Sequence, residues 1–361
     1  MKRITFIIIL VVVAIHLSLL VCLIQPKRER KSPDAQPQEQ QAEQTSPQTA
    51  QTGETQTQTQ MQPPPPAASE PEKPRWPQIP VYSDVYFQKA PRPLPQKLQE
   101  AAANCKAGVA VDLSSHTILW AKNESTSFTI ASLTKMVTTM LAVKKLYDSN
   151  GELTLETPIR ATREAAKIGG SQIWLDPSET FTFNELLKCI LVHSANDAAY
   201  LLAQYCGGTA DAFVQQMNDY TRQLGCKSFR FINPNGLPEK ERNNEENSAN
   251  AIELAYIADQ LLKLPEITAW SGVRIAYTRE HDEAYLKKHD GKATMLVSSN
   301  PLLGKCPGVN GMKTGFTNNS KFCLVATCER NGKSTCIVLL GCDNKQVRNT
   351  LAFGLVEWLY Q

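Results

Sequence analysis

Several features that would indicate a metal centre or a nucleic-acid partner are scarce or missing in this sequence. Only five of its 361 residues are histidines, and no two are spaced as in a zinc-protease helix. The cysteines form no C-x-x-C pair that would indicate a zinc site. Lysine and arginine (38) nearly balance aspartate and glutamate (35), whereas nucleic-acid-binding domains usually carry a basic patch. We therefore expect no metal, no other cofactor and no nucleic-acid partner.

Charge is also missing from Ile4 to Ile24, directly after the basic start of the chain. About 20 apolar residues span a bilayer as a helix, whereas the apolar core of a signal peptide has roughly 7 to 15. No small-x-small cleavage site follows this run. We predict that residues 1–25 are an uncleaved membrane anchor, with cleavage as the alternative. Positive charge on both sides leaves its orientation open.

Residues 26–78 differ in composition from the rest of the chain. They are rich in glutamine, threonine and proline, with 11 glutamines between Gln36 and Gln62. Such a segment cannot bury enough apolar surface to offset its chain entropy. We interpret it as a disordered linker that separates the anchor from a folded domain over residues 79–361.

Nine cysteines lie beyond the predicted anchor. An odd number in an exported domain leaves at least one of them unpaired. Cys189 and Cys206 occur within apolar helical patterns, so we interpret most of the nine as small buried hydrophobic residues. The sequence does not determine which of them pair.

The segment from residue 79 onward alternates strand and helix patterns. Thr182 and Glu185 form a capping box before an apolar helix, and Asn331-Gly332 predicts a hairpin turn. Strands near both ends, with helices between them, predict an α+β fold: one antiparallel sheet completed by both ends and a helical insertion. The predicted strands are 108–113, 117–121, 322–328 and 334–341, and the predicted helices are 132–147, 183–192, 197–206, 249–262 and 345–359.

Ser132-Leu133-Thr134-Lys135, the first of three short motifs, lies at the start of a predicted helix. The spacing places a hydroxyl and an amine on one helix face. A serine needs a nearby base to become a nucleophile, and a desolvated lysine with a lowered pKa can serve. Roughly one chance match is expected in a chain of this length. For this motif alone, the alternative is a serine cap and a solvated lysine.

The second motif, Ser194-Ala195-Asn196, lies between two predicted helices. Residues 248–250 and 298–300 also fit this pattern, so it selects no site by itself. The third motif, Lys313-Thr314-Gly315, is much rarer by chance. A lysine beside a glycine at a strand edge permits close approach of a substrate backbone and pairs with a carboxylate. The alternative is an exposed lysine in a turn.

Ser-x-x-Lys, Ser-x-Asn and Lys-Thr-Gly in this order resemble the signature set of penicillin-binding proteins and serine β-lactamases. The flanking segments resemble the D-alanyl-D-alanine carboxypeptidases of the S11 peptidase family. This resemblance covers most of residues 84–361 and selects Ser194 over the other two Ser-x-Asn matches. The segments that carry it are 130–135, 170–175, 186–199, 233–238 and 308–317.

The resemblance implies a five-stranded antiparallel sheet flanked by helices, with a helical subdomain. It also implies a bacterial peptidase that removes the last D-alanine from peptidoglycan stem peptides and is acylated by β-lactam antibiotics. Such an enzyme acts in the cell envelope, so we expect the anchor to hold an extracytoplasmic domain at the cytoplasmic membrane.

The resemblance further assigns roles to single residues. Ser132 attacks the penultimate D-alanine carbonyl and Lys135 takes its proton, while Ser194 and Asn196 relay protons and hold the peptide amide. The remaining assignments concern binding: the backbone amides of Ser132 and Phe316 form an oxyanion hole, Lys313, Thr314 and Arg348 meet the terminal carboxylate, and Gly315 allows close approach.

Four positions depart from the pattern of this family, but none of them carries a side chain assigned to the chemistry. They are Ile130, Ala195, Asn235 and Ser320-Lys321. Two alternatives remain. A class A β-lactamase needs a deacylating glutamate, for which Glu239 with Asn243 is the nearest match. A non-catalytic wall-binding module would keep the fold without the reaction.

Overall fold

The computed structural model describes residues 75–361. The predicted anchor, 1–25, and the linker as far as residue 74 lie outside the described residues. Within the described part of the chain, no helix is long and apolar enough to cross a membrane. The first described residues already pack against the rest of the domain. The ring of Trp76 lies edge-on against that of Tyr147, with 5.5 Å between ring centroids.

A six-stranded sheet forms the centre of the described part, in the order β1-β3-β2-β12-β11-β10. All neighbours pair antiparallel except β1, which is parallel to β3. Both ends of the domain contribute strands, as predicted. The strands of this sheet are β1 (Gln88–Lys89), β2 (Ala107–Asp112), β3 (Thr117–Lys122), β10 (Val309–Thr317), β11 (Lys321–Arg330) and β12 (Lys333–Cys342).

The prediction of a sheet with five antiparallel strands was wrong, because the sheet has a sixth strand, β1, which pairs parallel with β3. The chain before the first helix runs alongside β3, and its amides at Gln88 and Ala90 donate to the carbonyls of His116 and Ile118. These bonds satisfy backbone groups at the edge of the sheet. Two residues with no alternating pattern carry no strand signal that a sequence reading could detect.

The five predicted helices are confirmed within two residues at each end. The largest helix that the sequence reading missed is α6 (Ala210–Gln223). Three short two-stranded sheets accompany the main sheet: β4 (Phe128–Thr129) with β7 (Ser248–Ala249), β5 (Pro158–Arg160) with β6 (Thr180–Thr182), and β8 (Ile275–Thr278) with β9 (Thr294–Val297). The helices are α2 (Gln96–Ala103), α3 (Thr134–Asp148), α4 (Phe183–His193), α5 (Asn196–Gly207), α6 (Ala210–Gln223), α7 (Ala251–Leu261), α8 (Pro265–Ser271), α9 (Glu283–Lys288) and α10 (Lys345–Leu359).

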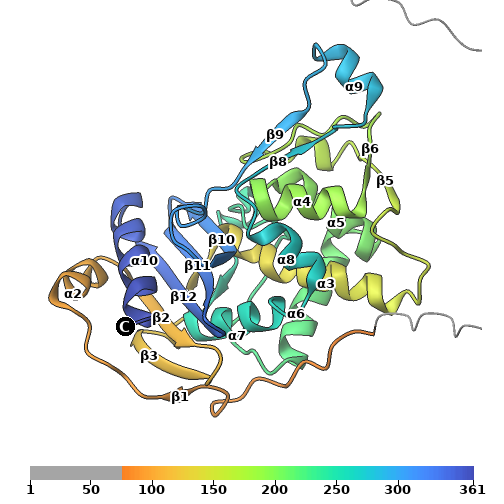
Figure 1. Cartoon of the computed structure of the whole chain (residues 1–361). Coiled ribbons are helices and arrows are strands. Elements are labelled where there is room, and N and C mark those ends of the chain that lie inside the picture. The colour runs from red at the N-terminus through yellow and green to blue at the C-terminus, as the bar shows by residue number, and fades with distance from the viewer. Residues whose placement is uncertain (1–74) are drawn as a thin grey trace, which may run out of the picture. The chain divides into compact units, whose positions relative to one another are not determined.

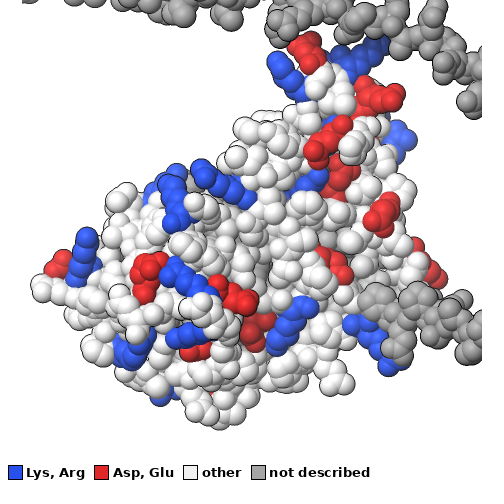
Figure 2. Space-filling view, in the orientation of Figure 1, with Lys and Arg blue, Asp and Glu red and all other residues white. Residues whose placement is uncertain are grey.

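The helices lie on both faces of the sheet (Figure 1). On one face α2 and α10 bury Leu98, Leu351 and Leu355 in a cluster that includes Leu324 and Leu339 of the sheet. On the other face α7 packs against β2, β11 and β12, and α3 to α6 form the helical subdomain beyond it. Lys and Arg are interspersed with Asp and Glu on the face shown in Figure 2.

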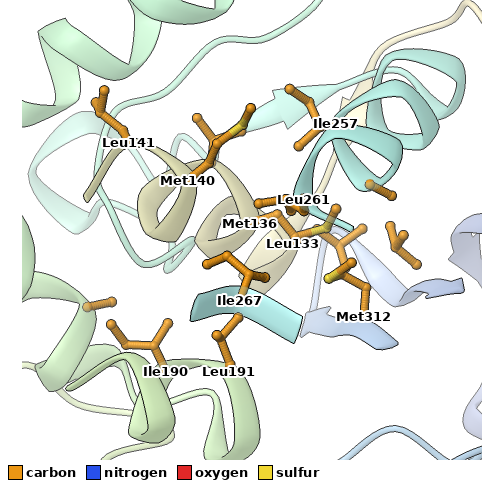
Figure 3. Packing of buried hydrophobic residues seen from close by; sticks show 14 of the residues in the cluster. Leu133, Met136, Met140, Leu141, Ile190, Leu191, Ile257, Leu261, Ile267 and Met312 are labelled. Atoms are coloured by element: carbon orange, nitrogen blue, oxygen red, sulfur yellow. The ribbon is translucent and has the colours of Figure 1, made fainter. Parts of the chain in front are cut away.

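Helix α3 is the centre of the larger core. Ten of its residues are buried, because it packs against helices of the subdomain and against the sheet-covering helix α7. Figure 3 shows its apolar side chains meeting residues from four other elements. These residues are Ile190 and Leu191 of α4, Ile257 and Leu261 of α7, Ile267 of α8 and Met312 of β10. This packing fixes the start of α3, which carries the first motif, against β10, which carries the third.

The described cysteines form one disulfide, Cys105–Cys342, which joins the chain just before β2 to the end of β12. The other seven are free thiols. Six of the seven are buried and Cys206 is half-buried. The interpretation of most cysteines as small buried hydrophobic residues is confirmed.

Candidate active site

Ser132 lies in a 3-10 turn, Ala131–Leu133, immediately before α3. The predicted helix therefore begins two residues later than expected. Gly236 packs directly against this turn, because a Cβ at Gly236 would lie 2.0 Å from the carbonyl oxygen of Ala131. Gly236 also has a φ of +86°, a conformation that L side chains rarely adopt. Only glycine fits at this position without displacing the turn that presents Ser132.

Lys135 is fully buried one turn after Ser132. Its Nζ donates to Ser132 Oγ at 2.9 Å, to Asn196 Oδ1 at 2.5 Å and to the carbonyl oxygen of Asn235 at 2.6 Å. Burial holds the pKa of Lys135 well below its ordinary value, and the nearby charge of Lys313 lowers it further. A lysine that loses its proton this readily, in hydrogen-bond contact with a serine hydroxyl, is suited to act as a general base.

The second motif connects the first motif to the third. Asn196 begins α5 and is held by two bonds of its own: Nδ2 donates to the carbonyl of Gly169 at 2.8 Å, and its backbone amide donates to Ser171. Ser194 follows the last residue of α4 and has a left-handed conformation with φ 66°. That turn aims its hydroxyl at Lys313, whose Nζ donates to Ser194 Oγ at 2.7 Å. The second motif thus holds the other two, because Asn196 bonds to Lys135 of the first and Ser194 bonds to Lys313 of the third.

Lys313 is buried within β10, at an edge of the main sheet. Burial lowers its pKa to about 7. Gly315 allows β10 to approach the nucleophile turn, because a Cβ there would lie 2.8 Å from the carbonyl oxygen of Ile130. Thr314 makes a short hydrogen bond with the hydroxyl of Ser299. The sequence reading gave Ser299 no role.

Phe316 and Arg348 line the same cleft as Ser132 and both contact Phe322. Phe316 is 53% exposed and its ring contacts Phe322, with 4.5 Å between centroids. Arg348 is buried in the first turns of α10, where its guanidinium lies over the same Phe322 ring and donates to Asn349. Burial lowers the pKa of Arg348. No salt bridge joins Arg348 to an acidic residue of the described chain, so its charge is available to an anionic ligand.

A cleft of about 690 Å³ brings the predicted residues together. Ser132, Ser194, Thr314, Gly315, Phe316 and Arg348 line it. Lys135, Asn196 and Lys313 connect to it through the hydrogen bonds given above. The residues of the described chain that line the cleft include four cations and no aspartate or glutamate; the cations are Arg274, Lys305, Lys345 and Arg348. The site therefore presents a serine nucleophile, a buried amine and an electropositive surface.

Sequence reasoning missed two groups that hold the site. The first is the backbone carbonyl of Asn235, which accepts from Lys135 and which no side-chain pattern could reveal. The second is Asp197, a buried carboxylate that accepts from the amides of Ile173, Leu175 and Ala198. Burial raises the pKa of Asp197. Its position directly after Asn196 in an apolar helix was a usable signal, because buried carboxylates need partners.

Comparisons with known proteins identify the family. Residues 95–344 match the peptidase S11 family model, described as D-alanyl-D-alanine carboxypeptidase. The D-alanyl-D-alanine carboxypeptidase DacF of Bacillus subtilis is 32% identical over 265 residues, which cover 73% of this chain and 64% of that protein. A D-alanyl-D-alanine endopeptidase of Pseudomonas aeruginosa is 28% identical, with 75% and 80% covered. The chain thus spans less than two thirds of the length of the first relative.

Solved structures show the same fold. Penicillin-binding protein D2 from Listeria monocytogenes, in a cefotaxime-bound form, matches with a TM-score of 0.61 and 25% identity, covering 72% of this chain and 98% of that one. Penicillin-binding protein 6B from Escherichia coli matches with a TM-score of 0.62 and 25% identity, covering 72% and 77%. The family match, the fold and the arrangement of the three motifs together show that this chain belongs to the S11 peptidases, the D-alanyl-D-alanine carboxypeptidase family.

Proposed function

We propose that this protein is a serine-type D-Ala-D-Ala carboxypeptidase that removes the terminal D-alanine from peptidoglycan stem peptides. The observation that carries the proposal is the hydrogen bond from the buried Lys135 to Ser132 in a cleft that also contains Thr314 and Arg348. A base, a nucleophile and a site for a carboxylate lie together there. The deciding experiment is mass spectrometry of the protein after benzylpenicillin, which should show one covalent adduct on Ser132.

The reaction follows from the contacts. Neutral Lys135 takes the proton of Ser132 as Oγ bonds to the penultimate D-alanine carbonyl carbon. Charge builds on the carbonyl oxygen, where the amides of Ser132 and Phe316 donate to it in the S11 pattern. As the C–N bond breaks, Lys135 gives up the proton that it took from Ser132, and the hydroxyl of Ser194, which Lys313 contacts, relays it to the leaving D-alanine nitrogen. Water then attacks the ester carbonyl while Lys135, neutral again, accepts a proton from it. As the bond to Ser132 Oγ breaks, Lys135 returns this proton to Oγ and the shortened peptide leaves with a free carboxylate.

We expect the substrate's free C-terminal carboxylate to be essential and to be held mainly by Lys313. Lys313→Ala and amidation of the peptide C-terminus should each lower kcat/KM by roughly 10- to 150-fold, because a charged hydrogen bond is worth about 1.5 to 3 kcal/mol. The measurement is hydrolysis of free and amidated D-Ala-D-Ala peptides by wild type and variant. If wild type and Lys313→Ala discriminate equally, the carboxylate is bound elsewhere, and Arg348 is the next residue to replace.

The pH dependence of kcat/KM should report both lysines. Lys135 acts in its neutral form, so activity rises with pH through its lowered pKa. Lys313 binds a carboxylate in its protonated form, so activity falls as pH rises above about 7. The alkaline fall should be present with free-carboxylate peptides and absent in Lys313→Met. A pH profile of Lys313→Met that keeps the same alkaline fall would contradict this assignment.

β-Lactam antibiotics are the second class of partner that we propose. The solved Listeria relative is described with cefotaxime bound, and a β-lactam offers Ser132 the same carbonyl and carboxylate as the peptide. A β-lactamase would need a glutamate in place to release the acyl group. None of the described residues that line the cleft is a glutamate. We therefore expect the penicillin adduct to persist for much longer than a lactamase intermediate, and a wall-binding module to form no adduct.

We also propose that residues 1–25 anchor the protein in the bacterial cytoplasmic membrane. Residues 26–78 are then the linker, and the peptidase domain lies on the extracytoplasmic side of this membrane. The Cys105–Cys342 disulfide supports this, because structural disulfides persist in oxidising compartments. Protease treatment of intact spheroplasts should digest the domain. Protection of the domain from added protease would contradict the proposed orientation.

A further inference from the structure

Trp174 is presented to solvent in an unusual way. Its side chain is 73% exposed, although tryptophan is usually largely buried. Its φ is +59°, in the left-handed region, where a bulky residue is an outlier that costs free energy. Such conformations persist where the surrounding structure enforces them, and they cluster at binding and catalytic sites.

Two buried charged residues enforce this conformation from either side. The Asp197 carboxylate accepts from the amides of Ile173 and Leu175, the neighbours of Trp174, at 3.0 and 3.3 Å. Arg279 donates to the carbonyl oxygen of Ile173 at 3.0 Å and to that of Trp174 at 3.3 Å. Asp197 and Arg279 are 1% and 4% exposed. The backbone of Trp174 is therefore fixed while its ring is left free.

Trp174 lines a cavity of about 840 Å³, which is larger than the cleft around Ser132. Tyr285 and His289 of the α9 region form another part of the wall, and their rings stack with centroids 3.9 Å apart. Asp176 and Asp282 add carboxylates to the lining. The cavity thus combines aromatic surfaces with hydrogen-bond acceptors.

This lining fits a neutral saccharide better than other ligands. A pyranose ring has an apolar C–H face that packs on an aromatic ring, and its hydroxyl and acetamido groups donate to carboxylates. A phosphate-bearing ligand would meet three carboxylates, those of Asp176, Glu179 and Asp282, but only one lysine, Lys288, in the described lining. A purely apolar ligand would remove water from these three charged groups, which costs free energy although each of them accepts a hydrogen bond within the chain.

The cavity lies within reach of the active site. Ser171 lines the cleft around Ser132, and its carbonyl accepts from the amide of Asn196. Trp174 follows three residues later, a span of at most about 11 Å. In the proposed substrate four stem residues separate the scissile bond from the sugar, a span of at most about 14 Å. The linings of the two cavities therefore adjoin along the chain, at a spacing no longer than the stem peptide.

We infer that Trp174 and this cavity bind the glycan strand of the substrate, a chain of N-acetylated amino sugars, while the cleft around Ser132 processes the attached peptide. The inference rests on the proposed carboxypeptidase function and extends it from the peptide to the polymer that carries it. It predicts a preference for glycan-linked over free pentapeptide.

Kinetics of the full-length protein test this directly. The two substrates are an N-acetylated pentapeptide and the same pentapeptide carried on a tetrasaccharide of β-1,4-linked N-acetylated amino sugars. Trp174→Ala should lower kcat/KM for the glycan-linked substrate about 5- to 10-fold, because the stacking contact is lost, and leave the free peptide within twofold. Trp174→Phe should retain most of the preference. An equal loss on both substrates, or no loss, would overturn the inference.

Two further variants separate binding from folding. Trp174→Gly removes the ring and also relieves the left-handed strain, so its unfolding midpoint should not be below that of wild type although its glycan preference is lost. Tyr205→Ala is the matched control, because Tyr205 is an exposed aromatic residue on α5. It should leave both substrates unchanged. A glycan preference that survives in Trp174→Gly would contradict the subsite.

A binding measurement keeps this test independent of catalysis. Titration with the tetrasaccharide of N-acetylglucosamine should shift the tryptophan emission of wild type and leave that of Trp174→Phe unshifted. If wild type shows this shift but forms no benzylpenicillin adduct, the saccharide site stands and the proposed enzymatic function fails. Equal shifts in wild type and Trp174→Phe would place the saccharide elsewhere.

Discussion

Ser132→Ala is expected to abolish both the benzylpenicillin adduct and the release of D-alanine, lowering kcat by at least about 10⁴-fold. The variant loses the only atom that forms the covalent bond, while the fold should remain, because Ser132 Oγ accepts one hydrogen bond from Lys135. Intact-protein mass spectrometry after benzylpenicillin and a D-alanine release assay measure the two effects.

Ser298→Ala is the matched control for this change. Ser298 lines the same cleft, and its Oγ accepts from the amide of Asn300 at 3.3 Å. This variant should keep the adduct and most of the activity. A normal adduct in Ser132→Ala would mean that another serine is the nucleophile, with Ser194 the next to examine because it too lines the cleft.

Lys135→Arg should lower the rate of acylation by orders of magnitude even though a long side chain with N–H donors is kept. Arginine stays protonated in proteins and cannot accept the proton of Ser132. Loss of a general base typically costs about 10²- to 10⁴-fold. The measurement is the rate of benzylpenicillin acylation by stopped-flow or quenched mass spectrometry, with thermal unfolding to confirm that the variant is folded.

Lys144→Arg makes the same substitution on the same helix, outside the cleft. Lys144 pairs with Asp148 near the end of α3 and has no contact with Ser132 in the hydrogen bonds of the described chain. It should acylate at the wild-type rate. If Lys135→Arg also did so, a base other than Lys135 would have to activate the serine.

Local signals predicted much of the fold. The Thr182–Glu185 capping box is present as two reciprocal hydrogen bonds at the start of α4, and the turn at Asn331-Gly332 connects β11 to β12 as expected. These features depend on a few neighbouring residues. Strand β1 could not be predicted in this way, because its two residues pair with β3 through backbone groups alone.

The candidate site was predictable as a set of side chains but not as a geometry. Three short motifs identified Ser132, Lys135, Ser194, Asn196 and Lys313, and the structure brings all five together. Their burial was not encoded in the motifs. The low pKa of Lys135 depends on packing by the whole helical subdomain and on the proximity of Lys313, which belongs to a strand far along the chain.

The main sheet contains strands from both ends of the domain, and this limits when the sheet can form during protein synthesis. Val109 of β2 pairs with Val338 of β12, and everything between them must be synthesised before they meet. Closing so long a loop is entropically costly, and sheets built from such non-local pairs fold slowly. Until β12 arrives, the hairpin of β2 and β3 has an open edge that can pair with other chains. Because β10 also comes late, a nascent chain has Ser132 and Lys135 long before it has Lys313. The residues of all three motifs are therefore present together only when synthesis of the domain is nearly complete.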